Sequence, residues 1–574
     1  MDANPSTTTR ESAVALHRGG KIAEAAALYE VLLESDPSDA DLWGFLSIAQ
    51  LRLERTCDAL ASWRKCLSFG VAAPSKLRNI ANFLLAMRQR IGSGAEPVEF
   101  LDGLDIPDWP GGLPLDKDNK AIVLALARCL IDFDRQEPAE RLLESALAGL
   151  PDDPDLLATL THVMIAGGKA EKALDLLRPL TSGAHRENGM LLIVHGAAAT
   201  AAKRREEAEI ISRRAREAVP VFLSAKKPTQ RLLVGVLNRA PRFIGKARTP
   251  KDLHFSQGLA VTLLKGMNDV FRLLSVFPPE AGKEALAGLP PPEVIFNNWV
   301  APEILSKAGA LEFISDYADG FGVPVINHPR GVYQTTRQRN AERLAGIPDL
   351  VVPRVLRIVN EPERRELLPA MIGEELGFPV IIRDPFTQVG GKMVRIGTPD
   401  ELAAYLSKVE QPQLYAIEYF DNPVAPGVYR KIRAAVIGDE LLITNIRFAV
   451  QWNVHLVTDA GERRKVMAFD TTGKAAALAH DIRRRPEETL GKPAMAALRE
   501  VRARTPLDFF GIDFDILPDG RLLFFEANAA MYFGFRTFEE LPETIRAQKD
   551  AIRRLFETPP ASSSRACAGS APPA

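Results

Sequence analysis

The chain has 574 residues, too many for a single hydrophobic core, so more than one domain is expected. Its residues are 46% hydrophobic and 25% charged, as in soluble globular proteins, and its formal net charge of −1 provides no overall field favouring nucleic acid or an acidic membrane. The four cysteines show neither metal-ligand spacing nor a CxxC pair, which argues against a zinc site and a disulfide framework.

The cellular location is expected by default rather than from a targeting motif. The first residues, MDANPSTTTRES, are polar and lack the apolar h-region of a signal peptide. No apolar run is long enough to span a bilayer. We therefore expect a cytoplasmic protein that has no membrane or nucleic-acid partner.

Residues 11–70 have the pattern of two helical hairpins. In the run EAAALYEVLLESDP, which ends at Pro37, apolar residues recur at i, i+3, i+4 and i+7, as on one face of a helix. Tyr29 is followed 34 residues later by Trp63. This spacing predicts a repeated helical unit whose apolar positions, Trp63 included, form its core.

The pattern continues further along the chain. Ala139 recurs 34 residues later as Ala173, the motif GGKAEKALDLL echoes GGKIAEAAALYE, and a weaker copy covers residues 190–220. Residues 92–116 are rich in Gly, Pro and Asp and interrupt the register. The spacing resembles the tetratricopeptide repeat, so we expect residues 1–222 to form an all-α, TPR-like solenoid of about four or five hairpins. Such an array either recruits a protein or peptide partner or serves packing and self-association, and the residues do not separate these roles.

From about residue 231 the pattern changes to strands that alternate with helix-length segments. The stretches RLLVGVLNRA, PEVIFNNWV and FGVPVINHPRGVYQTT each predict a buried strand, and the last is expected to end in a loop with His328, Pro329 and Arg330. Strands separated by helices predict a parallel sheet. We therefore expect an α/β domain over residues 223–350.

Residues 351–556 are expected to form a further domain built from paired strands. EELGFPVIIRDPFTQVGGKMVRIGT predicts two strands joined by a loop that contains Gly390 and Gly391. YRKIRAAVIGDELLITNIRF predicts a hairpin that turns at its Gly-Asp pair. The Pro/Ala/Ser-rich residues 557–574 follow, and we expect them to be disordered.

The last hairpin, FGIDFDILPDGRLLFFEAN, carries the most informative residues. With a turn of two or four residues around positions 519–520, Asp513 lies opposite Glu526, and Asp515 and Asn528 share their face. Facing carboxylates repel each other, and the oxygens of Asp, Glu and Asn are the hard ligands that Mg²⁺ prefers. The pattern therefore favours a divalent cation at this hairpin and leaves open whether Asp515 joins it.

Two alternatives remain open from the residues of this hairpin alone. Pro518 also suits a three-residue bulged turn, and the resulting one-residue slip would place Asp513 and Glu526 on opposite faces. The other alternative is an edge hairpin whose acidic face is simply solvated.

Asp513, followed thirteen residues later by Glu526-Ala527-Asn528, resembles the metal-binding end of ATP-grasp ligases. This superfamily includes D-alanine–D-alanine ligase and the glutathione-synthetase-like carboxylate–amine ligases. The resemblance covers roughly residues 231–555 and implies a pre-ATP-grasp α/β domain followed by an ATP-grasp domain. It also implies that ATP is a cofactor and that Asp513, Glu526 and Asn528 bind Mg²⁺, with Mn²⁺ as an alternative.

A further motif carries the resemblance to the phosphate-binding region. FPVIIRDPFTQVGGKM is similar to the strand, basic residue and glycine-rich loop that close over ATP phosphates, which implies roles for Gly390, Gly391 and Lys392. Where many members carry phosphate-binding lysines, this chain has Arg337 and Arg383. Arginine binds phosphate bidentately and stays charged, so the departure preserves the chemistry while changing its geometry.

The stretch AIEYFD resembles the hinge whose backbone meets the adenine. The resemblance implies that Glu418, Tyr419 and Phe420 bind the base. It also implies that Asp421 contacts the ribose.

YRKIRAAVIGDELLITNIR is similar to the glutathione-synthetase-like hairpin, which implies that Arg433 and Arg447 contact phosphates or the substrate carboxylate. Gly511 occupies the position where D-alanine ligases place an arginine, two residues before the metal aspartate. This departure favours the glutathione-synthetase-like branch, with Arg447 in the charge-stabilising role.

The segment FAVQWNVHLVTDAGERRKVMAFD lies between the two hairpins and is the strongest candidate for binding the acceptor. Trp452, Asn453 and His455 could contact a substrate there. Ordinary strand packing is the simpler interpretation of the same residues.

The resemblance therefore implies an ATP- and Mg²⁺-dependent ligase that joins a carboxylate to an amine through an acyl phosphate. The repeats would recruit the protein or peptide that carries one substrate. Two other functions stay open: a repeat-based adaptor whose ATP-grasp domain binds nucleotide without catalysis, and a kinase-like phosphotransferase on the same fold. The residues identify neither the acid nor the amine.

Overall fold

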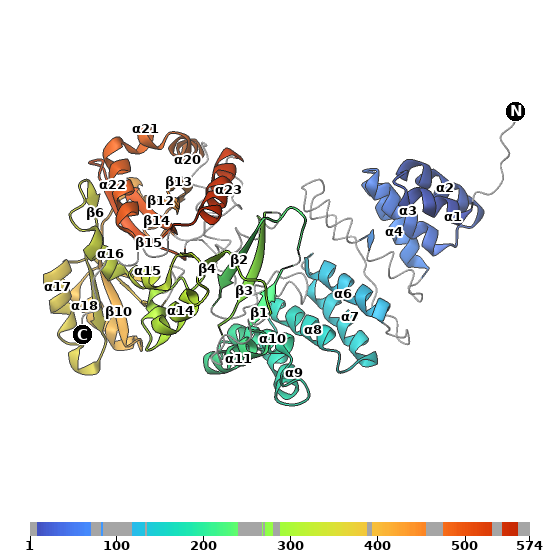
Figure 1. The fold of residues 1–574 in the computed structure, drawn as a ribbon, viewed down its shortest axis with the longest axis horizontal. Coiled ribbons are helices and arrows are strands. Elements are labelled where there is room, and N and C mark those ends of the chain that lie inside the picture. Colours follow the sequence, from blue (N-terminus) through green and yellow to red (C-terminus); the bar gives the residue numbers. More distant parts are fainter. Residues whose placement is uncertain are drawn as a thin grey trace. The chain divides into compact units, whose positions relative to one another are not determined.

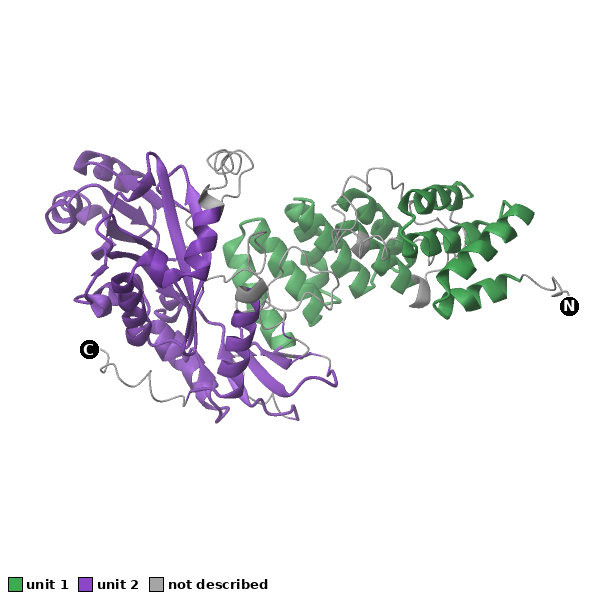
Figure 2. Ribbon diagram, turned by 90° about the horizontal axis from the view of Figure 1, so that it is seen from above, with its two compact units in different colours: residues 1–219, 240–256 green, residues 220–239, 257–574 purple. Residues whose placement is uncertain are grey.

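The computed structural model divides the chain into two compact units (Figure 2). Unit 1 comprises residues 1–219 and 240–256, and unit 2 comprises residues 220–239 and 257–574. The residues that the structure describes are 9–69, 82–83, 117–132, 135–224, 226–238, 267, 270–278, 288–386, 393–454, 474–530 and 542–560.

The described part of unit 1 is entirely helical (Figure 1). Within α1–α4 and within α6–α11, each helix packs against the next one in the chain, and buried aliphatic side chains fill the space between them. The helices are α1 (Arg10–Arg18), α2 (Ile22–Ser35), α3 (Ala40–Arg52), α4 (Thr56–Ser68), α6 (Lys117–Asp132), α7 (Gln136–Gly149), α8 (Pro154–Ala166), α9 (Ala170–Ser182), α10 (Gly189–Ala201) and α11 (Arg205–Ala218).

The helices recur at the spacing that the sequence predicts. Helices α2 and α4 begin 34 residues apart, as do α7 and α9. Trp63 is fully buried and stacks on Phe83 with ring centroids 4.2 Å apart, so its predicted place in the core is confirmed. Assignment of the array to the tetratricopeptide class stays a prediction.

Local capping explains where three of these helices begin. The side chain of Asp39 accepts hydrogen bonds from the first backbone N–H groups of α3, and Asp153 does the same for α8. Asn188 accepts from the N–H of Leu191 at the start of α10. A side-chain oxygen at this position satisfies backbone donors that have no partner within the helix.

A partly buried chain of hydrogen bonds links α9, α10 and α11. The His195 ring lies 2.8 Å from the Thr181 hydroxyl through Nδ1 and 2.9 Å from Glu207 through Nε2. Arg178 donates to both oxygens of Glu207 at 2.9 Å. These hydrogen bonds from Arg178, together with that from His195, lower the pKa of Glu207 from 4.5 to about 2.

This chain of bonds predicts a pH-dependent contribution to stability. Because the folded-state pKa of Glu207 is depressed, its contribution is fully present above the ordinary value of 4.5 and is lost as pH falls toward 2. We expect Glu207→Gln to destabilise the protein by about 1 kcal/mol at pH 7, since the carboxylate is partly exposed. Denaturant unfolding at pH 7 and pH 3 measures this, and a difference that is independent of pH would contradict it.

The described residues of unit 2 form three sheets, the first of which is mostly parallel. Its order is β1-β3-β2-β4-β5; β3, β2, β4 and β5 run parallel, and β1 pairs antiparallel at the edge. The strands are β1 (Val221–Leu223), β2 (Leu232–Leu237), β3 (Phe271–Val276), β4 (Val294–Asn297) and β5 (Val325–Ile326). The predicted strands β2, β4 and β5 and their parallel arrangement are confirmed, while β1 and β3 were not predicted.

One prediction for this region is wrong. His328, Pro329 and Arg330 do not form a loop: Pro329–Tyr333 is a short helix, α15, and His328 caps it by accepting from the N–H of Arg330 at 3.2 Å. Its Nε2 atom lies 2.9 Å from the carboxylate of Asp319. A proline at the first helical position with a polar residue before it favours this helix start.

The second sheet is antiparallel in the order β7-β10-β8-β9. Helices α17 and α18 pack against it and enclose a small apolar core (Figure 1). The predicted pairing of β8 with β9 is confirmed. The strands are β7 (Val355–Val359), β8 (Val380–Arg383), β9 (Met393–Ile396) and β10 (Gln413–Glu418).

The third sheet has the order β11-β12-β14-β15-β6, and β13 also pairs with β12. The predicted turn at Gly438 and Asp439 is confirmed, because Ile437 pairs with Glu440 and Gly438 has φ 60°. The strands are β6 (Leu350–Val351), β11 (Pro423–Ala425), β12 (Val428–Ile437), β13 (Glu440–Ala449), β14 (Phe509–Ile516) and β15 (Leu522–Asn528).

Helices pack around these sheets in unit 2. Within the described part of the chain, no helix combines the length and apolar character needed to cross a membrane. The helices are α13 (Pro302–Leu305), α14 (Ala310–Asp319), α15 (Pro329–Tyr333), α16 (Arg337–Leu344), α17 (Leu368–Leu376), α18 (Pro399–Lys408), α20 (Lys474–Arg484), α21 (Pro486–Leu490), α22 (Lys492–Arg504) and α23 (Pro542–Glu557), with a 3₁₀ turn, η4, at Pro362–Arg364.

The β14–β15 hairpin resolves the alternatives that its sequence left open. The N–H of Leu517 donates to the carbonyl of Arg521, so a three-residue turn over residues 518–520 joins the strands. The slip that this turn introduces is reversed further along, because Phe514 pairs with Phe524 whereas Asp513 pairs with Glu526. A bulge at Phe525 therefore returns both carboxylates to one face.

Candidate active site

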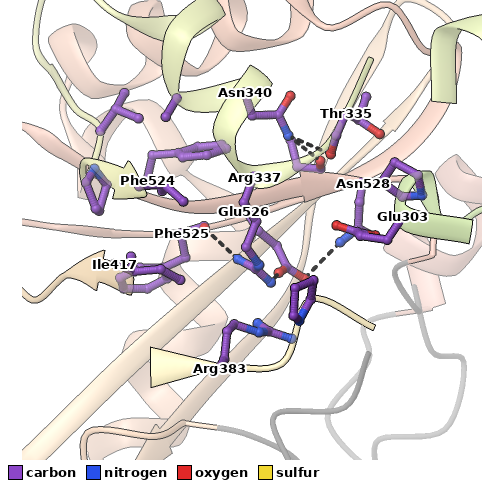
Figure 3. Close-up of a pocket in the computed structure, with 17 residues that line it drawn as sticks. Glu303, Thr335, Arg337, Asn340, Arg383, Ile417, Phe524, Phe525, Glu526 and Asn528 are labelled. Carbon is purple, nitrogen blue, oxygen red and sulfur yellow. Dashed lines mark hydrogen bonds and ion pairs between the residues drawn. The ribbon is translucent and has the colours of Figure 1, made fainter. Parts of the chain in front are cut away.

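A cleft in unit 2 runs between the second and third sheets. Its walls come from β8, β10, β12, β14 and β15 and from the first residue of α16. A second pocket continues from it and shares Arg337, Arg383 and Glu526 with it (Figure 3). The residues singled out from the sequence that line the two pockets are Arg337, Arg383, Glu418, Tyr419, Phe420, Trp452, Asn453, Asp513, Asp515, Glu526 and Asn528.

Asp513 is buried and is bound by two cationic side chains from β12. Arg433 donates to Oδ1 at 2.6 Å and to Oδ2 at 2.8 Å, and the ammonium of Lys431 lies 3.1 Å from Oδ2. Burial alone would raise the pKa of Asp513, but the two cations outweigh it and hold that pKa well below its usual range. Asp513 is therefore a carboxylate at neutral pH.

Glu526 faces Asp513 across the strands and also has its own partners. It forms an ion pair with Arg337, and the amide of Asn528 donates to its Oε1 at 2.9 Å (Figure 3). The Oδ1 atom of Asn528 accepts from the N–H of Ala530 at 2.9 Å, which fixes the orientation of the amide. The three polar groups predicted for the metal site thus lie together on one face of the hairpin.

Two arginines from different elements converge on this end of the cleft (Figure 3). Arg337 is the first residue of α16, and Arg383 is the last residue of β8. Burial lowers the pKa of Arg383 to about 9, and the charge of Arg337 contributes to the same shift. Burial also lowers the pKa of Arg337. The shift of Arg383 therefore reflects both its burial and the nearby charge of Arg337, and an anionic ligand beside Arg383 would oppose it.

The polar side chains of the hinge after β10 are bound by neighbouring side chains. The carboxylate of Glu418 is bound by Arg354 at 2.9 Å. Both Tyr419 and Tyr429 donate their hydroxyls to Oδ1 of Asp421, at 2.8 and 2.9 Å. These two hydrogen bonds lower the pKa of Asp421. The hinge is therefore held in one conformation by its own side chains, and Asp421 does not line the described cleft.

The remaining predicted residues lie close to the carboxylate pair or outside the described residues. Arg447 on β13 pairs in register with Lys431 on β12. Burial lowers the pKa of Arg447, and the charge of Arg433 contributes to that shift. Gly390, Gly391, Lys392 and His455 lie outside the described residues.

Several cleft residues were not found by sequence reasoning. Lys431 shares its strand face with Arg433, two residues away, and that alternation was the signal that could have identified it. Glu303, Asn340 and Tyr429 also line the pockets. Tyr429 lies on β12 in the same alternation as Lys431. Glu303 and Asn340 come from α13 and α16, whose approach to the hairpin is set by tertiary packing, so no local motif marks those two.

The donor set at the hairpin suits a hard divalent cation. Two carboxylates and an amide lie within one strand pair, and such oxygens are the ligands that Mg²⁺ prefers. Among the described residues no cluster of three His, Cys, Asp or Glu side chains could hold a metal ion, so a cation here would need oxygens beyond the two carboxylates. The Asn528 amide and the phosphates of a bound nucleotide are the groups that could supply them.

Comparisons with known proteins give distant structural likenesses. Neither a protein-family model nor a curated protein matches this chain. Among solved structures, N5-carboxyaminoimidazole synthase from Aspergillus clavatus matches at 17% identity and TM-score 0.35, over 58% of this chain and 79% of that one. The RimK domain protein ATP-grasp from Sphaerobacter thermophilus matches at 14% identity and TM-score 0.31, over 57% and 98%. D-alanine-D-alanine ligase from Coxiella burnetii matches at 11% identity and TM-score 0.33, over 57% and 94%.

Proposed function

We propose that this chain is an ATP- and Mg²⁺-dependent ligase that joins a carboxylate to an amine through an acyl phosphate. The observation that carries the proposal is the facing pair Asp513 and Glu526 at the end of a cleft that also receives several cationic side chains. A phosphoryl group in transfer carries charge on its oxygens, and stabilising that charge is the main task of such a site.

The two ends of the cleft differ in polarity, and each would bind a different part of ATP. Its apolar end, next to the hinge, includes Met393, Ile417 and Leu523, which suits the faces of a purine base. In our proposal the backbone of Glu418, Tyr419 and Phe420 meets the edge of the base. The Oδ2 atom of Asp421 is the carboxylate oxygen to which neither tyrosine donates, so it is the one proposed to contact the ribose.

The charged end would hold the triphosphate and the cation. Asp513, Glu526 and Asn528 would bind Mg²⁺, which when bound would supply charge neutralisation for the phosphates. Arg337 and Arg383 would hold phosphate oxygens, together with Gly390, Gly391 and Lys392. Arg433 and Arg447 would stabilise the negative charge that develops on the acyl phosphate.

The proposed reaction has two bond exchanges. A carboxylate oxygen of the acid attacks the γ-phosphorus of ATP, the bond from that phosphorus to the bridging oxygen breaks, and ADP leaves. The amine nitrogen then attacks the acyl carbon, the carbon–oxygen bond to the phosphoryl group breaks, and inorganic phosphate leaves with the electron pair. The nitrogen loses one proton and the amide remains.

Unit 1 has a separate role in the proposal. Its helical array would recruit a protein or peptide that carries one of the two substrates. Deleting unit 1 would then raise the KM for a macromolecular acceptor and leave the KM for a small analogue unchanged.

The test is ADP release by the full chain with Mg-ATP and pools of carboxylic acids, amino acids and short peptides. We expect ADP only when an acid and an amine are both present, together with a product whose mass is their sum less one water. A phosphorylated product from a single substrate would indicate a phosphotransferase. Nucleotide binding without turnover would indicate an adaptor, and a lack of Mg-ATP binding would overturn the nucleotide site itself.

A further inference from the structure

Glu303 brings an additional carboxylate to the pocket beside Glu526 (Figure 3). It lies in α13, a single helical turn that follows the carboxyl end of β4 in the parallel sheet. Proline at the first position and the buried side chain of Leu305 hold this turn in place. The pocket therefore combines one residue of the first sheet region with Arg383 of the second sheet and Glu526 of the third.

The two glutamates of this pocket differ in the partners that their carboxylates have. Glu526 has Arg337 and the amide of Asn528 as partners. Glu303 is half-buried, and it has no hydrogen bond or ion pair to another side chain among the described residues. Burial raises the pKa of Glu303, although the more distant charges of Arg337 and Arg383 oppose that shift.

A partly buried carboxylate without a partner side chain is costly, and a donor from a ligand would reduce that cost. A phosphate or a carboxylate ligand would be repelled by Glu303 and would go to the two arginines instead. A group with N–H donors and positive charge is therefore the chemistry that fits next to Glu303. In a carboxylate–amine ligase the amine substrate has this chemistry.

We infer that Glu303 binds the ammonium group of the acceptor amine and so selects a primary amine as the nucleophile. This inference rests on the proposed ligase function and names the substrate class for one part of the site. The ammonium transfers one proton to the carboxylate of Glu303 and attacks as the neutral amine. The nitrogen–carbon bond forms, the carbon–oxygen bond to the phosphoryl group breaks, and phosphate leaves with the electron pair. The second proton of the nitrogen passes to the departing phosphate, and the neutral amide remains.

Hydroxylamine distinguishes binding of the amine by Glu303 from formation of the acyl phosphate. It is a small nucleophile that is neutral at pH 7.5, and it converts an acyl phosphate to a hydroxamate without needing a site for an ammonium group. Formation of the acyl phosphate is thus measured by hydroxamate, and use of the amine is measured by the amide product.

The variants are Glu303→Gln, which keeps the shape and removes the charge, and Glu303→Asp, which keeps the charge. Glu312→Gln on α14 is the matched control, since Glu312 is exposed and does not line the described pockets. Each is assayed as the full chain with the acid and amine that support ADP release in the wild type, and thermal unfolding confirms that each is folded.

We expect Glu303→Gln to raise the KM for the amine about ten- to a hundredfold, because a charge-assisted hydrogen bond is lost. The KM for ATP and the rate of hydroxamate formation should stay within twofold of wild type, and Glu303→Asp should recover part of the amine affinity. An unchanged KM for the amine in Glu303→Gln overturns the inference. An equal fall in hydroxamate and amide also overturns it, because Glu303 would then act on the nucleotide or the metal. If the wild type forms neither hydroxamate nor ADP, the proposed function itself fails.

Discussion

Replacing Glu526 by glutamine is expected to lower ADP formation by about a hundred- to a thousandfold, the loss typical of removing one group that stabilises transition-state charge. Glu526 lies directly opposite Asp513 and is held by Arg337 and Asn528, so glutamine keeps its shape but removes one negative charge. A hard cation depends on that charge, and the orientation of Arg337 depends on it as well.

The measurement is the rate of ADP release at saturating nucleotide, titrated with Mg²⁺. The midpoint of the Mg²⁺ titration should move to higher concentration along with the loss of rate. Glu440→Gln is the matched control, because Glu440 is exposed and forms a surface ion pair with Arg554 at 3.1 Å. A Glu526→Gln variant with wild-type rate and Mg²⁺ midpoint would remove Glu526 from the proposed metal site.

Loss of Arg433 has the second large expected effect, and the effect is on stability. Arg433 binds both oxygens of the buried Asp513, so Arg433→Met leaves that carboxylate with only Lys431 as a cationic partner. Breaking one partner of a buried ion pair costs about 3–5 kcal/mol, because a charge remains in a medium of low polarity. We expect a loss of this size in the free energy of unfolding.

A double-mutant cycle tests whether the loss comes from the pair. Asp513→Asn in the Arg433→Met background removes the carboxylate that has lost its arginine partner. The double variant should therefore be more stable, by about 1–3 kcal/mol, than the sum of the two single losses predicts. The exposed pair Arg554–Glu440 supplies the control cycle, with an expected coupling below about 1 kcal/mol. Additive losses at Arg433 and Asp513 would contradict a direct ionic coupling.

Local sequence determines the elements that carry the site. The turn at Gly438 follows from a residue that tolerates positive φ, and the β12–β13 hairpin forms where it was predicted. Alternation along β12 places Lys431 and Arg433 on one face, which any strand of this sequence would do. The alternation of side chains along a strand and the preference of a residue for a turn are local properties. Both can therefore be predicted from the sequence alone.

The contacts across elements depend on the tertiary structure. The three-residue turn of the last hairpin would by itself have separated Asp513 from Glu526, and the bulge at Phe525 is what brings them to one face. That bulge leaves Phe514 and Phe524 paired in the buried core of the hairpin, so core packing sets the register of the strands. Local preference alone left two registers open.

The sequence by itself determined the helical period of unit 1, the hairpins of unit 2 and the residues from which a cation site could be built. Only the tertiary structure decided which charges meet: Arg337 with Glu526, and Lys431 with Asp513. It also placed Glu303 in the pocket of both arginines without an ion pair among the described residues. The physical reason is that a pairing of charges depends on distance in space and on burial, and neither is set by spacing along the chain.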